Sequence, residues 1–198
     1  MIDKIILNGE DYQISEGNLP ALVTYGEHMG GSHLSITLIA QLFLSGSKIL
    51  FLTAYPMAKD KFLEQIGPDH SGVAFVNSIE ELKQAKDAQV IILDSGNEAL
   101  FVEVANTLPD LHERVTLVKN MEEFKEEVFE VCLPLEKLLL SGNIDTCIAK
   151  EKISKTNFKT TITFNQPQTP LSITVPQLEK YSGYLSSNNK NGIIHINK

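Results

Sequence analysis

Short apolar runs alternate with longer amphipathic segments along most of the chain. Runs of the kind found in strands buried on both faces of a sheet lie at residues 21–25, 48–55, 73–78, 88–95 and 114–119. Apolar positions with helical spacing predict helices at residues 33–46, 56–67, 79–86, 121–132 and 135–142. Strands alternating with helices at this spacing predict an α/β fold, with a mainly parallel central sheet covered by helices on both faces.

Capping residues sharpen the limits of several of these helices. Ser78 followed by Glu81 forms a capping box, and Asn120 and Glu123 occupy the corresponding positions before the helix at 121–132. Gly142 is expected to end the short helix at 135–142.

The two ends of the chain have a different pattern. "KIILNGEDYQIS" predicts a hairpin with its turn at "NGE". From Glu151 onward the chain is rich in β-branched residues, and "NNKNG" predicts a turn between strands at 181–187 and 193–197. We expect a single domain over 1–198, with a core at 17–150 and an antiparallel extension of the sheet at 151–198.

Composition narrows the possible functions. The 198 residues carry a formal net charge of -8, and Arg114 is the only arginine. Such a chain lacks the basic surface that releases counterions from a nucleic acid backbone, so nucleic acid binding is not expected. Hydrophobic residues at 42% and charged residues at 21% are ordinary for a globular protein.

Three weaker features of the sequence indicate where in the cell the protein is located. The long apolar stretch Leu34–Tyr55 is interrupted by "SGSK", and a membrane span would bury Lys48 near the bilayer centre at roughly 2.5–3.5 kcal/mol, so no span is expected. "MIDKIILNGE" does not resemble a signal peptide, and Cys132 and Cys147 form no C-x-x-C motif. These features predict a cytoplasmic protein.

The loop between the first buried strand and its helix has the outline of a phosphate-binding loop. Gly26 and Gly31 have the separation of the two glycines in G-x-x-x-x-G-K-[ST], but Ser32 replaces the lysine and His33 replaces the magnesium-binding hydroxyl. The backbone amides of Gly30, Gly31 and Ser32 could still attract an anion at the helix N-terminus. A plain strand-to-helix turn explains the same residues.

Three further stretches extend the similarity. "VIILDSGNEALF" resembles a Walker B strand, "SGSKILFLTAY" resembles the strand that carries a catalytic glutamate, and "RVTLVKN" resembles the strand that ends in a γ-phosphate sensor. Together with the loop they resemble the RecA/KaiC-like P-loop ATPases over Leu19–Asn120. The resemblance implies a magnesium-facing role for Asp94, which a simple cap at the strand end would also explain, and a sensor position for Asn120.

The departures from that family concern its catalytic chemistry. The loop lysine is absent, the catalytic glutamate position falls on Tyr55, and Ser95 after Asp94 offers no alternative base. The resemblance therefore implies a degenerate ATPase without catalytic residues. A weak or vestigial nucleotide site, for ATP or ADP with magnesium, would comprise Gly26, Gly30, Gly31, Ser32, His33, Asp94 and Asn120, with Ser35 or Ser32 as a partial substitute for the missing hydroxyl.

Other side chains allow simpler interpretations. His28 and His33 could carry charge below about pH 6.5 or merely border the helix, and a metal site there lacks an identifiable third ligand. Tyr181 and Tyr184 are expected to be strand residues. Acidic side chains at 122, 123, 126, 127 and 130 form either a solvated face or a surface for a partner.

These features favour a non-catalytic scaffold, adaptor or regulatory subunit that acts through a protein partner or through self-association. One alternative is a doubly wound domain or enzyme whose loop at 26–33 holds a different anionic ligand, with Ser32 and His33 as contacts. Another is an ATPase completed in trans by a partner's lysine.

Overall fold

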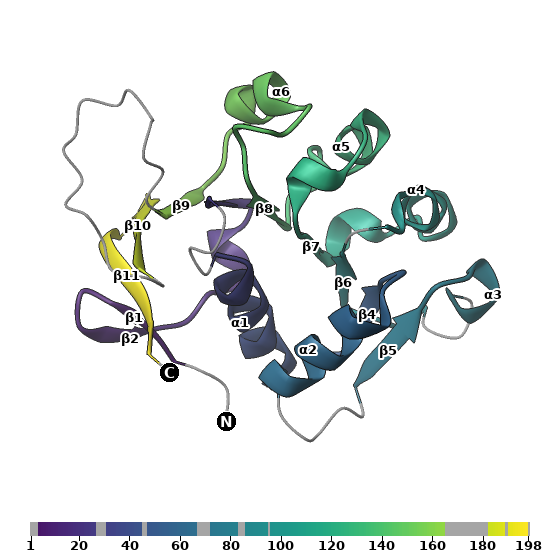
Figure 1. Ribbon diagram of the computed structural model, residues 1–198, viewed down its shortest axis with the longest axis horizontal. Helices are drawn as coiled ribbons and strands as arrows, with labels where there is room; N and C mark the ends of the chain where they lie inside the picture. The colour runs from purple at the N-terminus through teal and green to yellow at the C-terminus, as the bar shows by residue number, and fades with distance from the viewer. Residues whose placement is uncertain are drawn as a thin grey trace.

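A single mixed sheet runs through the whole computed structural model (Figure 1). The structure describes residues 4–26, 31–44, 47–66, 72–82, 86–94, 96–164, 182–188 and 190–197. Its eleven strands have the order β2-β1-β11-β10-β9-β3-β8-β7-β6-β4-β5. The strands are β1 (Lys4–Leu7), β2 (Glu10–Tyr12), β3 (Ala21–Thr24), β4 (Ile49–Leu52), β5 (Val73–Val76), β6 (Val90–Leu93), β7 (Val115–Val118), β8 (Leu138–Gly142), β9 (Thr160–Phe164), β10 (Ser182–Ser187) and β11 (Asn191–Asn197).

Helices cover both faces of the parallel part of the sheet. On one face lie α1 (Gly31–Leu44) and α2 (Pro56–Ile66), and on the other lie α3 (Ile79–Leu82), α4 (Glu98–Thr107), α5 (Glu126–Cys132) and α6 (Lys150–Lys155) (Figure 1). Single 3-10 turns lie at Glu16–Asn18, Leu111–Glu113 and Met121–Glu123. The predicted fold class, with helices on both faces of a mainly parallel sheet, is confirmed.

Alternation along each central strand produces two cores. On β4, Ile49 and Phe51 pack in the core beneath α1 and α2, whereas Leu50 and Leu52 pack in the core beneath the other helices. Successive side chains of a strand point to opposite faces, so a strand covered on both sides must be apolar at every position. This requirement explains the uninterrupted apolar runs in the sequence.

The C-terminal segment extends the sheet as expected, and the N-terminal hairpin joins this extension. β9 joins the edge of β3 in parallel, and β10, β11, β1 and β2 then follow in antiparallel order. The predicted hairpin at the N-terminus therefore lies beside the C-terminal strand, with Ile5 opposite Ile196. Residues 165–181, which include Tyr181, lie outside the described residues, whereas Tyr184 lies on β10 as predicted.

The prediction of a helix at 135–142 is wrong. Residues Leu138–Gly142 form β8, a fully buried strand between β3 and β7. Three consecutive leucines fit a helix and a doubly covered strand equally well, and here the burial on both faces decides for the strand.

The helix predicted at 121–132 is divided. A 3-10 turn at Met121–Glu123 precedes α5, and Asn120 adopts a left-handed conformation with φ 60° instead of capping a helix. α4 and α6 are not among the predicted helices. α4 follows the strand that ends at Asp94, and α6 lies at the start of a segment whose β-branched residues favour strands. Among the described residues, no helix is long and apolar enough to cross a membrane.

Candidate functional site at the carboxyl edge of the sheet

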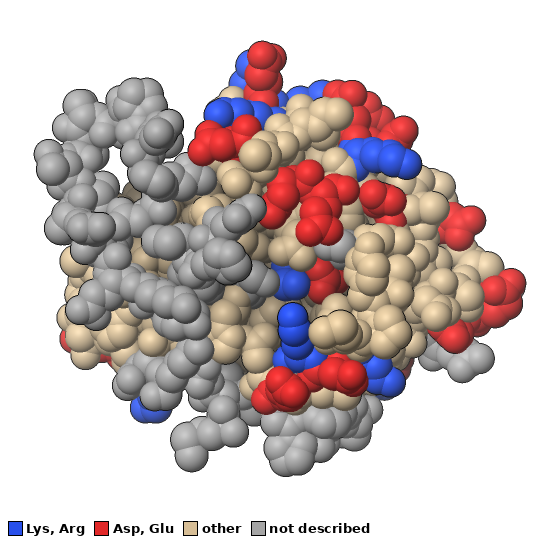
Figure 2. Space-filling model, viewed as in Figure 1, with Lys and Arg blue, Asp and Glu red and all other residues tan. Residues whose placement is uncertain are grey.

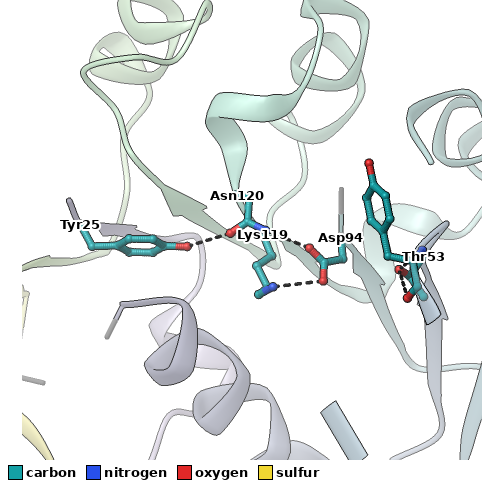
Figure 3. Close-up of polar contacts among 6 residues, drawn as sticks. Tyr25, Thr53, Asp94, Lys119 and Asn120 are labelled. Atoms are coloured by element: carbon teal, nitrogen blue, oxygen red, sulfur yellow. Dashed lines mark hydrogen bonds and ion pairs between the residues drawn. The ribbon is translucent and has the colours of Figure 1, made fainter. Parts of the chain in front are cut away.

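Polar side chains meet where several parallel strands end. In α/β sheets the crevice outside the carboxyl ends of the strands is the usual place for a ligand. Here Tyr25 follows β3, Asp94 follows β6, and Lys119 and Asn120 follow β7. Figure 3 shows these side chains in one row across the edge, above the start of α1.

Asp94 is the centre of this row. Its side chain is almost fully buried, with 4% of the residue exposed. One carboxylate oxygen, Oδ1, accepts a hydrogen bond from Nδ2 of Asn120 at 3.0 Å, and the other, Oδ2, lies 3.0 Å from Nζ of Lys119. Both oxygens of the carboxylate are therefore held by donors of the same chain.

Asn120 connects Asp94 to Tyr25, the residue that follows β3. Its left-handed backbone turns the chain sharply after β7, and its side chain then faces the sheet edge. Oη of Tyr25 lies 3.4 Å from Oδ1 of Asn120 and donates a long hydrogen bond to it. A continuous polar chain thus runs from Tyr25 through Asn120 and Asp94 to Lys119 (Figure 3).

The ring of Tyr25 packs against the first residue of α1. A Cβ added to Gly31 would lie 2.0 Å from Cδ1 and 2.6 Å from Cβ of Tyr25. Tyr25 is 7% exposed, and Gly31 is buried. Gly31 is needed here for a close approach between an aromatic side chain and the helix start.

The structure places the remaining predicted residues as follows. Gly26 is half-buried after β3, and the side chain of His33 in α1 lies beside α2, with Nδ1 2.6 Å from Nε2 of Gln65. Gly30, His28 and Ser95 lie outside the described residues, as does the side chain of Ser32. The structure thus brings together Tyr25, Gly31, Asp94 and Asn120, whereas His33 is directed toward α2.

Ser35 cannot supply the missing hydroxyl. Its side chain is fully buried, and Oγ donates a hydrogen bond to the carbonyl oxygen of Gly31, 2.9 Å away, within α1. The hydroxyl is therefore committed inside the helix, and the expectation for this residue is wrong.

Tyr55 stands beside the polar row at the end of β4. Its ring lies over Gly96, and 54% of the residue is exposed. Oγ1 of Thr53 accepts a hydrogen bond from the backbone N–H of Tyr55 at 3.1 Å, which fixes this turn. No carboxylate occupies the position, so the turn provides no general base.

The residues present do not fit magnesium with a nucleoside triphosphate. Mg²⁺ takes oxygen ligands at about 2.0–2.1 Å in near-octahedral geometry. At Asp94 an ammonium group and an amide hold both carboxylate oxygens, and the ring of Tyr25 packs against Gly31, the first residue of α1. Among the described residues, no group of three His, Cys, Asp or Glu side chains could hold a metal ion.

Lys119 and Tyr25 are the two residues of this site that the sequence analysis did not select. Both directly follow a buried strand, and polar residues at the carboxyl ends of parallel strands share one edge of the sheet. That position, combined with the predicted parallel sheet, was the available signal for both.

The similarity of this chain to known proteins is found in its structure. No family model and no curated protein sequence matches the chain. Among solved structures, the cytoplasmic domain of EssC matches with a TM-score of 0.57 and 12% identity, covering 100% of this chain and 43% of the other. The pCW3 conjugation coupling protein TcpA, solved with ATPγS, matches with a TM-score of 0.54 and 10% identity, covering 98% of this chain and 66% of the other.

A third match covers the full length of the matching protein. The genome packaging NTPase B204 from Sulfolobus turreted icosahedral virus 2, solved with ATPγS, has a TM-score of 0.58 and 14% identity, with coverage of 93% and 100%. The chain spans less than half the length of the EssC fragment and about two thirds of TcpA. At these identities the matches establish only that this chain shares the α/β fold of these proteins, with its mostly parallel sheet.

Proposed function

We propose that this protein is a non-catalytic member of the P-loop NTPase fold class that acts as a scaffold, adaptor or regulatory subunit through protein contacts. The observation that carries the proposal is the carboxylate of Asp94, which is bound on both oxygens by Lys119 and Asn120. In an active site of this fold, the aspartate that ends the Walker B strand helps to hold the metal ion.

The chemistry of phosphoryl transfer supports this conclusion. The reaction depends on cations that absorb the charge developing on the phosphoryl oxygens and on a residue that orients the nucleophile. Here Ser32 stands in place of the loop lysine, and the exposed Tyr55 stands in place of the glutamate. Within this reading, the RecA/KaiC-like resemblance implies a subunit that works beside other subunits, since members of that class form rings or filaments.

The surface offers features suited to protein contacts. Tyr55 and Met57 are 54% and 70% exposed beside the carboxyl edge. Figure 2 shows acidic side chains around α5, and Lys152 of α6 pairs with Glu126 at 2.7 Å. The acidic face is therefore partly neutralised by its own neighbour, which leaves the exposed apolar side chains as the stronger candidates for contact.

The solved structures indicate which nucleotides to test. B204 and TcpA were both solved with ATPγS. We propose that any remaining nucleotide affinity of this chain, through ATP or ADP, is weak and lies at the start of α1.

Two measurements on the purified protein test the function. We expect no phosphate release from ATP above the background of the buffer, with or without magnesium. We also expect no thermal shift with ATP, ADP or a non-hydrolysable analogue, whereas a ligand at a hundred times its Kd would stabilise the fold by about 2.7 kcal/mol and raise Tm by roughly 5–10 °C. Steady turnover would exclude the proposal. Binding without turnover would make the protein a nucleotide sensor. A shift with inorganic phosphate alone would favour an anion-binding domain.

A further inference from the structure

The buried cation of Lys119 is the feature of the sheet edge that a merely inactive ATPase does not require. We infer that the Lys119 ammonium is a built-in counter-ion that takes the place of a divalent metal at Asp94, so that the carboxyl edge is electrostatically complete without any ligand. The inference rests on the proposed non-catalytic function and extends it, because it assigns a replacement to the metal as well as a loss of catalytic groups.

The geometry of the ion pair supports this role. The side chains of Lys119 and Asp94 are 14% and 6% exposed, so both charges are largely removed from water. A buried carboxylate requires a cation or several donors nearby, because desolvation of an unpaired charge is costly. Nζ of Lys119 supplies the cation to Oδ2, and Nδ2 of Asn120 supplies a donor to Oδ1.

The backbone fixes Lys119 in this position. Its N–H donates to the carbonyl oxygen of Leu93 at 3.0 Å, which ties the end of β7 to the end of β6. The next residue, Asn120, leaves the strand with φ 60° and directs its own side chain to the same carboxylate. Two consecutive residues therefore converge on Asp94 from one strand end.

A metal ion at this carboxylate would have to displace or adjoin the ammonium group. A dication beside an ammonium in a site of low dielectric is strongly repelled, since charge interactions strengthen as water is excluded. The wild-type carboxylate is therefore expected to be closed to Mg²⁺ and Mn²⁺.

The test compares Lys119→Met with the control Lys137→Met. Lys137 lies just before β8 and forms a more exposed ion pair with Glu16. Thermal unfolding is measured in EDTA, Mg²⁺ and Mn²⁺, and binding of Mn²⁺ alone is followed by its electron paramagnetic resonance signal. We expect no response of the wild type or of Lys137→Met to either metal. Lys119→Met should lose roughly 6–12 °C in EDTA. The double variant Asp94→Asn with Lys119→Met, in which no carboxylate is left without its cation, should regain most of that loss.

Three results would overturn the inference: stabilisation of the wild type by Mn²⁺, a Lys119→Met variant as stable as Lys137→Met, or a double variant Asp94→Asn with Lys119→Met that regains none of the loss. If Lys119→Met does not fold, the double variant Asp94→Asn with Lys119→Met decides. Recovery of folding in that variant supports the counter-ion role, and failure to recover excludes it. Phosphate release by the wild type would instead defeat the proposed function, so the two failures are distinguishable.

Discussion

At the scale of single residues, the contact between Tyr25 and Gly31 leaves no room for a methyl group. We expect Gly31→Ala to destabilise the fold by about 1–3 kcal/mol, because the new Cβ would lie within 2.6 Å of the base of the Tyr25 side chain, and the ring cannot swing away from it there. Urea unfolding measures the change. Gly17→Ala is the control, since a Cβ there meets only Oγ of Ser15 at 3.6 Å. Equal stability of both variants would show that the ring does not pack on the helix start.

Arg114 forms an ion pair with Asp110, and the stability that this pair contributes depends on pH. Its Nη2 lies 3.0 and 2.9 Å from the two carboxylate oxygens of Asp110, and Nη1 donates to the carbonyl oxygen of Ala88. The hydrogen bond from Arg114 lowers the pKa of Asp110 below its ordinary value. A carboxyl whose pKa is lowered on folding stabilises the protein above its ordinary pKa, and that stability disappears as the pH falls through the lowered value.

We therefore expect Arg114→Lys, whose single ammonium cannot contact Asp110 and the carbonyl oxygen of Ala88 with two separate nitrogens, to be less stable than the wild type at neutral pH. The difference should narrow as the pH falls below about 4, the ordinary pKa of an aspartate, leaving only the part due to Ala88. Urea midpoints over this pH range measure the difference. Asp110→Asn should remove the pH-dependent part, and a difference that stays constant with pH in the wild-type background would contradict the assignment.

At the scale of elements, the unit formed by α5 and the loop before α6 buries both cysteines. Burial raises the pKa of Cys132 to about 12 and also raises the pKa of Cys147. Because only the thiolate reacts, we expect Cys132 in the native protein to react on the order of a thousandfold more slowly near pH 8 than in the unfolded chain. Thiol titration with and without denaturant measures this, and rapid native labelling would show that α5 opens easily.

Strand β7 carries a buried hydroxyl. Among the residues that the structure describes, Oγ1 of Thr116 has no hydrogen-bond partner, and it has no exposed surface. We expect Thr116→Val, which preserves the shape, to leave stability unchanged or to raise it by about 1 kcal/mol, because an unsatisfied buried hydroxyl is removed. The control Thr146→Val, at an exposed loop position, should change stability by less than about 0.5 kcal/mol. A loss above about 1 kcal/mol in Thr116→Val would reveal a partner for the hydroxyl.

At the scale of the whole molecule, the sheet joins both ends of the chain. β1 pairs with β11, and β9 pairs with β3, so the antiparallel strands and the parallel strands belong to one hydrogen-bonded sheet. The core beneath α1 contains Leu185 of the antiparallel strand β10 as well as Ile162 of β9 and Val23 of β3, which pair in parallel. We therefore propose that residues 1–198 form one domain.

One domain predicts one unfolding transition. We expect circular dichroism and tyrosine fluorescence to follow the same urea curve. We also expect a chain ending after Lys155 to lack cooperative unfolding, because β3 and β1 would each lose a neighbouring strand. Two separate transitions in the full chain, or a folded truncated chain, would show that the residues after Lys155 form an independent unit.

Much of the fold was predictable because covered parallel strands leave a strong pattern. β3, β4, β6 and β7 lie within predicted apolar runs, and α1 and α2 start within two residues of their predicted positions. The error at β8 has the same origin, since a run of leucines has no period that separates a strand from a helix. Of the candidate site, Gly31, Asp94 and Asn120 were selected from sequence, whereas Tyr25 and Lys119 were not.

The sequence by itself determined the class of fold and the absence of the loop lysine and of a glutamate at Tyr55, because these depend on local pattern and on residue identity alone. The tertiary structure decided that β8 is a strand, that α1 begins against the ring of Tyr25, and that Lys119 neutralises Asp94. These features depend on which strands become neighbours in the sheet. Asp94 and Lys119 are 25 residues apart in the chain, and the pairing of β6 with β7 brings Nζ of Lys119 to 3.0 Å from Oδ2 of Asp94.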